Sequence, residues 1–294
     1  MSYDLYFKVR DSQAKFTRES ARGFFDQRKN YQLTDAQAIY QNRATGVYFN
    51  FNFDEIIDGE SPGTLPIAFS LNFYRPHIFG IEAELEVRAF VKALNLLVFD
   101  PQIGGMGEGE YSTEGFLAGW NKGNHFAYSA FLQGNPDQKP PVLATARIED
   151  CWRWNFAVAS VQKRLGDKFF VPRYLFVEHE GRVVRMIAWP DGVPTAIPES
   201  DIIAIPRKPN LRDRFFGTKE GVVFAAWDDV QPLLEKFPKT MESLPYCFLG
   251  GSNAPSSIAA RKRKIKPILG RPTSVAIDKI MNRELVEEAR KHVQ

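Results

Sequence analysis

The chain has 294 residues, 44% of them apolar and 25% charged, and a formal net charge of +3. This composition is typical of a folded globular protein and excludes a disordered or fibrous chain. It holds no run of about 18 apolar residues, so the sequence predicts no membrane-spanning helix.

The first half is predicted to alternate strands and helices. Strands are indicated where apolar and polar residues alternate, and helices where apolar residues lie three or four apart. In chain order the prediction is strand 3–9, helix 17–28, strand 46–53, strand 67–74, helix 81–97 and strand 96–99. We expect segment 33–40 to continue the helical layer and segment 113–132 to add another helix. The order β-α-β-β-α-β is that of a ferredoxin-like sandwich, in which helices cover one side of an antiparallel sheet.

Residues 134–141 are the predicted linker between two domains, because prolines in a polar run disfavour packing. We therefore expect a ferredoxin-like domain at 1–133 and a mixed α+β domain at 142–294. Charge agrees with this division. Residues 1–140 hold 13 Lys/Arg and 17 Asp/Glu, whereas the remaining residues hold 25 and 18.

The second half is predicted to be α+β as well. The strands expected there are 174–179 and 182–189, which form a hairpin, and 201–205, 221–227 and 246–249. The helices expected are 148–165, 228–237 and 274–292. The first of these helices is expected to bury one stripe of apolar residues, made up of Ile148, Trp152, Phe156 and Ala159.

The two phenylalanine-rich strands have one apolar and one polar face. The phenylalanine face is assigned to the core, with helix 81–97 covering it. The polar face carries Tyr48, Asn50, Asn52, Ser70, Asn72 and Tyr74. Tyrosine and asparagine are good recognition residues. We expect either the second domain or a partner to pack on this face.

No pattern in the chain predicts a catalytic centre, a cofactor or a metal site. The four histidines form no HxH or HExxH motif, and Cys151 and Cys247 form no CxxC motif. These two cysteines are expected to be buried thiols in a reducing cytoplasm. His77 could activate a nucleophile, but its place after Pro76 favours a helix start. The glycines between 104 and 109 resemble a phosphate loop, yet Glu108 beside them would repel phosphate, and a mobile acidic loop is expected instead.

Charged clusters give candidate contact residues. Two acidic loops can imitate phosphate and cap a basic active site. The first contains Asp54, Glu55, Asp58 and Glu60, and the second contains Glu108, Glu110 and Glu114. Three further acids, Glu82, Glu84 and Glu86, are expected on the solvated face of their helix. The basic run 261–266 lacks interleaved aromatic residues, so a solvated helix end is favoured over a nucleic-acid site.

Several of these segments resemble immunity proteins of bacterial polymorphic-toxin and type VI secretion systems. The resemblance rests on the opening MSYDLYF, on strand 46–53, on the run 69–79 with Arg75-Pro76, and on Phe99-Asp-Pro-Gln102. It is strongest over residues 1–102. The two-domain length is similar to that of partners of restriction-endonuclease-like toxins. Such families imply no catalysis, because the protein binds a cognate toxin and blocks it; no binding residue is carried over.

The expected function is therefore that of a cytoplasmic immunity protein that occludes a toxin, such as a nuclease, stoichiometrically. The candidate contact residues are the two acidic loops together with Asn50, Asn52 and Asn72. Two alternatives stay open. One is a hydrolase or transferase that uses carboxylates with His77 or His125 in an interdomain cleft. The other is a nucleic-acid-associated protein that uses Arg261–Lys266.

Overall fold

A computed structural model describes residues 1–10, 17–53, 64–102, 104–190, 193–206, 221–234 and 264–291, and the backbone of 247–249. The chain divides into two compact units. Unit 1 comprises residues 1–148 and 278–294, and unit 2 comprises residues 149–277. Within the described part of the chain, no helix is both long and apolar enough to cross a membrane.

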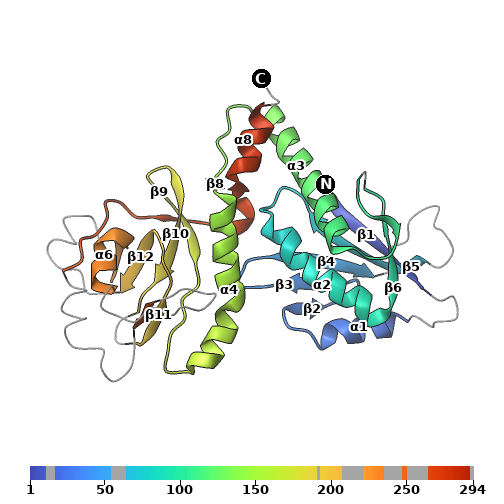
Figure 1. Ribbon diagram of the computed structural model, residues 1–294, viewed down its shortest axis with the longest axis horizontal. Helices are drawn as coiled ribbons and strands as arrows, with labels where there is room; N and C mark the ends of the chain where they lie inside the picture. The colour runs from blue at the N-terminus through green and yellow to red at the C-terminus, as the bar shows by residue number, and fades with distance from the viewer. Residues whose placement is uncertain are drawn as a thin grey trace. The chain divides into compact units, whose positions relative to one another are not determined.

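Unit 1 is built on a seven-stranded sheet in which every neighbouring pair is antiparallel (Figure 1). The strands lie in the order β2-β3-β4-β5-β1-β6-β7. Their bounds are β1 (Ser2–Val9), β2 (Tyr31–Leu33), β3 (Gln37–Gln41), β4 (Tyr48–Phe53), β5 (Thr64–Asn72), β6 (Leu96–Asp100) and β7 (Gly107–Gly109). Both this sheet and the helices below confirm the predicted α+β class.

Three helices pack on one face of this sheet: α1 (Arg18–Asp26), α2 (Ile78–Leu94) and α3 (Thr113–Gly134). Aromatic rings join all three to the same face. The ring centroids of Phe25 of α1 and Phe90 of α2 are 4.7 and 5.0 Å from that of Phe51 of β4. The ring centroid of Phe116 of α3 is 5.8 Å from that of Phe69 of β5. The phenylalanine face is therefore the core, as predicted.

The central strands follow the predicted element order. β4, β5, β1 and β6 are adjacent in that order, and α1 and α2 lie in the connections between them in sequence. This is the strand order of a split β-α-β sandwich. β2, β3 and β7 widen the sheet beyond it, and the ferredoxin-like assignment itself stays a prediction.

The prediction that segment 33–40 is helical was wrong. These residues form the end of β2, the turn after it and most of β3, in a hairpin at the edge of the sheet. Alternate residues Ala38 and Tyr40 are buried, and the Tyr40 ring stacks on Phe49 of the neighbouring strand at 4.4 Å. Pairing with β4 thus decides the conformation of a segment whose own pattern is short and ambiguous.

The C-terminal residues belong to unit 1, which differs from the predicted division at 134–141. The predicted helix 274–292 is instead β15 (Thr273–Val275), a 3-10 turn η1 (Ile277–Lys279), β16 (Met281–Asn282) and α8 (Arg283–Lys291). β16 pairs with β8 (Val142–Leu143), and α8 packs beside α3 (Figure 1). The physical reason is a buried cluster of residues from α3, β16 and α8, namely Tyr128, Leu132, Met281, Val286 and Ala289.

Unit 2 contains a five-stranded sheet in the order β13-β12-β10-β9-β15. Its strands are β9 (Leu175–His179), β10 (Arg182–Ala188), β12 (Ile202–Pro206), β13 (Val222–Ala226) and β15. β10 and β12 are parallel, and the other pairs are antiparallel. A two-stranded ladder joins β11 (Thr195–Ile197) to β14 (Cys247–Leu249). Among the residues described, the helices are α4 (Thr145–Leu165), which begins in unit 1, and α6 (Trp227–Leu234).

The buried stripe of α4 differs from the predicted one. Ile148 is buried, but Phe156 is 46% exposed, and the helix buries Trp154 and Asn155 instead. The indole Nε1 of Trp154 donates to the Pro172 carbonyl at 2.7 Å. Asn155 accepts from the backbone N–H of Tyr174 at 2.8 Å and donates to its carbonyl at 3.1 Å. Because these polar groups find backbone partners, they can be buried, and apolar spacing alone misplaces the stripe.

Candidate functional site

The candidate site is the outer face of the unit 1 sheet, defined as the strand side chains that point away from α1, α2 and α3. Because side chains alternate along a strand, these residues lie between the buried ones. Its residues at the centre of the sheet are all half-buried or exposed apart from Ala68; they are Asp4, Tyr6, Asn50, Asn52, Ala68, Ser70, Asn72 and Phe99. Ile39 of β3 lies opposite Asn50, and Lys8 of β1, which is buried, lies beside Phe99.

The strand register brings polar residues from three strands into one row. Asn50 of β4 lies opposite Ser70 of β5, and Ser70 lies opposite Asp4 of β1. Asn72 lies two residues along β5 on the same face. Asn50 and Asn72, which the sequence assigns to one face, are therefore close neighbours around Ser70. Asp4 joins them only through the strand order, since it is 46 residues from Asn50 and 66 residues from Ser70 in sequence.

Hydrogen bonds orient the polar side chains of this row. The Asn50 amide Nδ2 donates to Asn52 Oδ1 at 2.5 Å, and Ser2 Oγ donates to Asp4 Oδ2 at 2.7 Å. Side chains held in this way lose less rotamer freedom when a partner binds.

An aromatic corner adjoins the polar row. Tyr6 of β1 lies opposite Phe99 of β6, and their ring centroids are 6.2 Å apart. The Lys8 ammonium lies 5.8 Å from the centre of the Phe99 ring and 2.7 Å from Glu108 Oε1 on β7. The outer face thus combines amide, hydroxyl and aromatic groups with few charges.

Two predicted members of this face lie elsewhere. Tyr74 follows the end of β5 with a positive φ of 64°, and its ring packs against Tyr128 and Phe131 of α3. Tyr48 places its ring 5.5 Å from the buried Phe79 of α2, and its hydroxyl donates to Asp278 Oδ2 at 3.0 Å. Tyr74 lies beyond the end of β5, where the alternation stops, and Tyr48 is the first residue of β4, where its ring reaches α2.

The acidic positions of the second loop already have partners. Glu108 pairs with Lys8, and both Glu110 carboxylate oxygens pair with the Arg10 guanidinium. The hydrogen bond from Arg10 lowers the pKa of Glu110. Glu114 accepts from Ser112 Oγ at 3.2 Å in the first turn of α3, where a negative charge favours the helix dipole. The four acids of the first loop, Asp54, Glu55, Asp58 and Glu60, lie outside the described residues.

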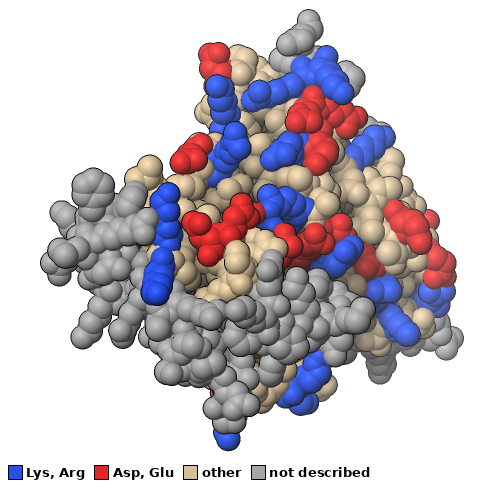
Figure 2. Space-filling model, turned by 60° about the vertical axis from the view of Figure 1, so that its left-hand side comes forward, with Lys and Arg blue, Asp and Glu red and all other residues tan. Residues whose placement is uncertain are grey.

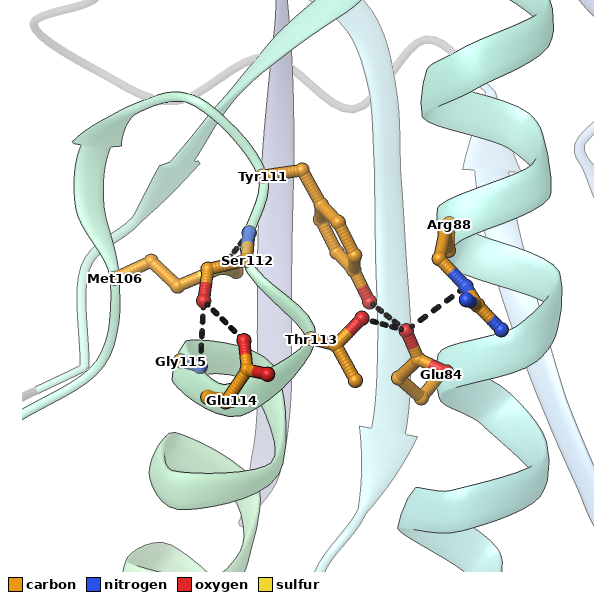
Figure 3. A network of polar contacts seen from close by, with 8 residues as sticks. All are labelled: Glu84, Arg88, Met106, Tyr111, Ser112, Thr113, Glu114 and Gly115. Atoms are coloured by element: carbon orange, nitrogen blue, oxygen red, sulfur yellow. Dashed lines mark hydrogen bonds and ion pairs between the residues drawn. The ribbon is translucent and has the colours of Figure 1, made fainter.

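The prediction that Glu82 and Glu84 lie on a solvated helix face was wrong. Glu82 is fully buried and accepts from the Tyr40 hydroxyl, the Asn42 amide and the Thr45 hydroxyl at 2.8, 2.8 and 3.1 Å. Glu84, which is 4% exposed, is held by the network in Figure 3.

In that network, the start of α3 binds a carboxylate of α2. Glu84 Oε1 accepts from Thr113 Oγ1 at 2.7 Å and from the Tyr111 hydroxyl at 3.2 Å, and Arg88 Nε lies 3.3 Å away (Figure 3). Ser112 caps α3 by accepting from the Gly115 N–H at 3.0 Å. Carboxylates on α2 thus bind neighbouring segments and have structural partners.

The glycine-rich turn after β6 is also organised by a carboxylate. Asp100, 2% exposed, accepts from the backbone N–H groups of Gln102 and Met106 at 3.0 and 2.9 Å, and from the Tyr3 hydroxyl at 2.7 Å. A Cβ on Gly105 would lie 2.0 Å from Asp100 Oδ2, so only glycine fits this position. The glycines therefore shape a turn around Asp100.

The histidines named as catalytic candidates both contact the C-terminal segment. His77 stands at the N-cap of α2, as predicted, with its Nδ1 2.6 Å from Asn282 Nδ2. His125 Nε2 lies 3.9 Å from Glu288 Oε2 of α8. The described residues contain no group of three or more His, Cys, Asp or Glu that could hold a metal ion. Of the two cysteines, Cys151 is a buried thiol; the Cys247 side chain lies outside the description.

The basic run is described only in part. Lys264 and Lys266 are exposed on either side of the buried Ile265, and Arg261, Lys262 and Arg263 lie outside the described residues. On the face shown in Figure 2, the described basic and acidic side chains are interspersed. This mixed surface gives no support to an extended basic site.

No family model matches the chain, and neither the curated proteins nor the solved structures gave a match. The assignment of a function consequently depends on the residues themselves.

Proposed function

We propose that this protein binds a cognate protein toxin in the cytoplasm and neutralises it by stoichiometric occlusion, without catalysis. The outer face of the unit 1 sheet is the proposed contact surface. The observation that supports it is the polar row that Asn50, Ser70 and Asp4 form across three strands. The resemblance to immunity proteins supplies the class of partner.

The chemistry of the outer face supports a protein partner. The centres of protein interfaces are depleted in charge and enriched in aromatic residues, and asparagine and serine supply adaptable hydrogen bonds. The outer face has these features: Tyr6 and Phe99 beside an amide and hydroxyl row. Lys8, the cation next to them, is already paired with Glu108.

The internal partners of the acidic loop argue against a simple acidic plug. Glu108 and Glu110 each pair with a cation of β1 or the residue after it. An acid already paired in this way offers a basic cleft less attraction. The proposed contact is consequently the outer face, with Glu108 and Glu110 at its edge.

Co-expression with the product of a neighbouring toxin-like gene tests the proposal. The native chain should abolish toxicity and elute with the toxin as one complex from a sizing column. If toxicity persists and no complex forms, the proposed function fails.

A charge placed on the outer face locates the contact. Ser70→Arg introduces a long side chain into the centre of the polar row. We expect binding to weaken at least about 100-fold, because the added bulk prevents close packing at the centre of the interface, even where Asp4 opposite pairs with the new charge. Binding affinity is measured by calorimetry. Ala93→Arg, at an exposed position of α2, is the matched control and should bind as the native chain does. Unchanged affinity of Ser70→Arg would place the contact elsewhere.

A further inference from the structure

The C-terminal segment of unit 1, residues 278–291, is tied to the body of the unit by the buried side chain of Asn282. Asn282 Oδ1 accepts from the backbone N–H of His77 at 3.0 Å. Its Nδ2 lies 2.6 Å from His77 Nδ1 and donates to Thr145 Oγ1 at 3.0 Å. One side chain therefore joins β16 to the starts of α2 and α4.

These contacts fix the proton on His77. A backbone N–H can only donate, so it must face the amide oxygen of Asn282. The amide nitrogen then faces His77 Nδ1, and because that nitrogen also only donates, Nδ1 must accept. The arrangement requires a neutral imidazole whose hydrogen is on Nε2.

The hydrogen bonds on the Thr145 side of Asn282 agree with this assignment of donors and acceptors. The Thr145 hydroxyl accepts from Asn282 and donates to Glu284 Oε2 at 2.5 Å. A carboxylate only accepts. Donors and acceptors therefore alternate correctly from His77 to Glu284 only when His77 is neutral.

We infer that His77 and Asn282 form a proton-sensitive latch, which holds segment 278–291 on unit 1 when His77 is neutral and loosens it when the imidazole is protonated. A proton taken up from solvent at Nδ1 produces an imidazolium whose N–H faces the N–H of the Asn282 amide. The hydrogen bond is lost and two donors oppose each other. The latch does not depend on the proposed function.

Loosening the latch would uncover an apolar surface. α8 lies beside α3 (Figure 1), and the two helices share the buried cluster of Tyr128, Leu132, Met281, Val286 and Ala289. The partly buried Tyr74, Phe131, Val142 and Leu285 pack against it. The latch thus controls access to an apolar patch on unit 1.

Other charges around the latch bear on its pH dependence. The charged residues within four positions in sequence of His77, Thr145 or Asn282 are Arg75, Arg147, Glu149, Asp278, Lys279, Arg283 and Glu284. One further pair acts in the opposite direction. Protonated His125 would attract Glu288 of α8, whose carboxylate is 3.9 Å away. Glu288 is exposed, so water weakens this attraction.

Hydrogen exchange of the full chain tests the latch. Amide protection of residues 281–291 is compared at about pH 7.5 and about pH 5.5, on either side of the ordinary histidine pKa of about 6.5, after correction for the intrinsic rate. We expect protection of this segment to fall at least about tenfold at the lower pH, while protection of β1 and β5 is unchanged.

Two variants separate the latch from general acid sensitivity. His77→Asn places an amide oxygen near the position of Nδ1, so it still accepts but cannot titrate, and protection should be equal at both pH values. Asn282→Asp supplies a carboxylate that accepts from an imidazolium, so protection should be higher at the lower pH. His125→Gln removes the opposing pair and should increase the native pH dependence.

The native chain and its variants give two results that would overturn the inference. Equal protection of residues 281–291 at both pH values in the native chain and in His125→Gln refutes the latch. So does a pH dependence that persists in a folded His77→Asn variant. Protection of β1 and β5 in the same experiment reports whether each variant is folded.

Discussion

At the scale of single residues, buried carboxylates decide how the helices of unit 1 attach to its loops. Glu82 of α2 binds the β3–β4 connection, and Glu84 of α2 binds the start of α3. Asp100 accepts hydrogen bonds from the glycine-rich turn. A carboxylate can be buried only when hydrogen bonds replace its water. The sequence shows three acids on one helix but does not show the hydroxyl and amide donors to Glu82 and Glu84, which lie 27 to 42 residues away.

Removal of the Glu82 carboxylate should be strongly destabilising. Glu82→Ala leaves the Tyr40, Asn42 and Thr45 donors without their acceptor in a buried site, so we expect a loss of about 3 kcal/mol in the free energy of unfolding. Urea denaturation measures it. Glu82→Gln retains an oxygen acceptor and should lose less. A change within about 0.5 kcal/mol in Glu82→Ala would show that the carboxylate is not stabilising.

At the scale of elements, α2 and α3 approach each other at a glycine. A Cβ on Gly80 would lie 2.1 Å from Trp120 Cδ1, a distance that real contacts do not reach. The Trp120 ring is fully buried and stacks on Phe73, with centroids 5.4 Å apart, so it has little room to move. The helix crossing therefore requires glycine at this position.

Two glycine-to-alanine substitutions in helices should consequently change the free energy of unfolding in opposite directions. Gly80→Ala forces the Trp120 ring to shift, and we expect a loss of about 1–3 kcal/mol. Gly23→Ala, on the exposed side of α1 with no atom within 4 Å of the added Cβ, should gain roughly 0.5–1 kcal/mol through higher helix propensity. Thermal or urea denaturation of both variants measures the difference. A stabilised Gly80→Ala variant would contradict the close approach.

Element prediction succeeded where a local pattern sufficed. Strands β1, β4, β5 and β6 and helices α1 to α4 lie where alternation or helical spacing predicts them. The hairpin of β9 and β10 turns at Glu180 and Gly181, both with positive φ, as a two-residue type I′ turn requires. The failures were β2 and β3, which depend on pairing with β4, and the C-terminal segment, which depends on α3. The acidic loop expected at 104–109 was also wrong in part, because Gly107–Gly109 pair with β6 as β7.

At the scale of the whole molecule, buried tyrosines should make the free energy of unfolding fall at alkaline pH. Burial raises the pKa of Tyr3, Tyr40 and Tyr111, and the carboxylates of Asp100, Glu82 and Glu84 respectively raise each further. Burial also raises the pKa of Tyr74 to about 12. In the unfolded chain these phenols ionise near pH 10. The folded state thus holds protons that the unfolded state releases.

The contribution of these tyrosines to stability should consequently be constant from about pH 8 to about pH 10 and should fall above that pH. Each tyrosine that stays neutral in the folded state lowers the free energy of unfolding by up to about 1.4 kcal/mol per pH unit. The urea midpoint, measured from about pH 8 to about pH 11, tests this expectation. Tyr3→Phe removes one titrating group, so its alkaline slope should be shallower. Equal slopes in the two proteins would exclude Tyr3 as a contributor.

The sequence by itself determined the α+β class, the strands with their two faces, and the assignment of Asn50, Asn52 and Asn72 to the face opposite the core. These properties depend on the alternation of apolar and polar residues that are neighbours in the chain, so they can be read from one sequence. Tertiary structure decided that Asp4 and Tyr6 share that face, that Tyr74 leaves it, and that Glu82 is buried. It also decided that residues 278–291 return to unit 1. Each of these depends on partners distant in sequence, because burial of a polar or apolar group is stabilising only when a complementary group arrives from elsewhere in the fold.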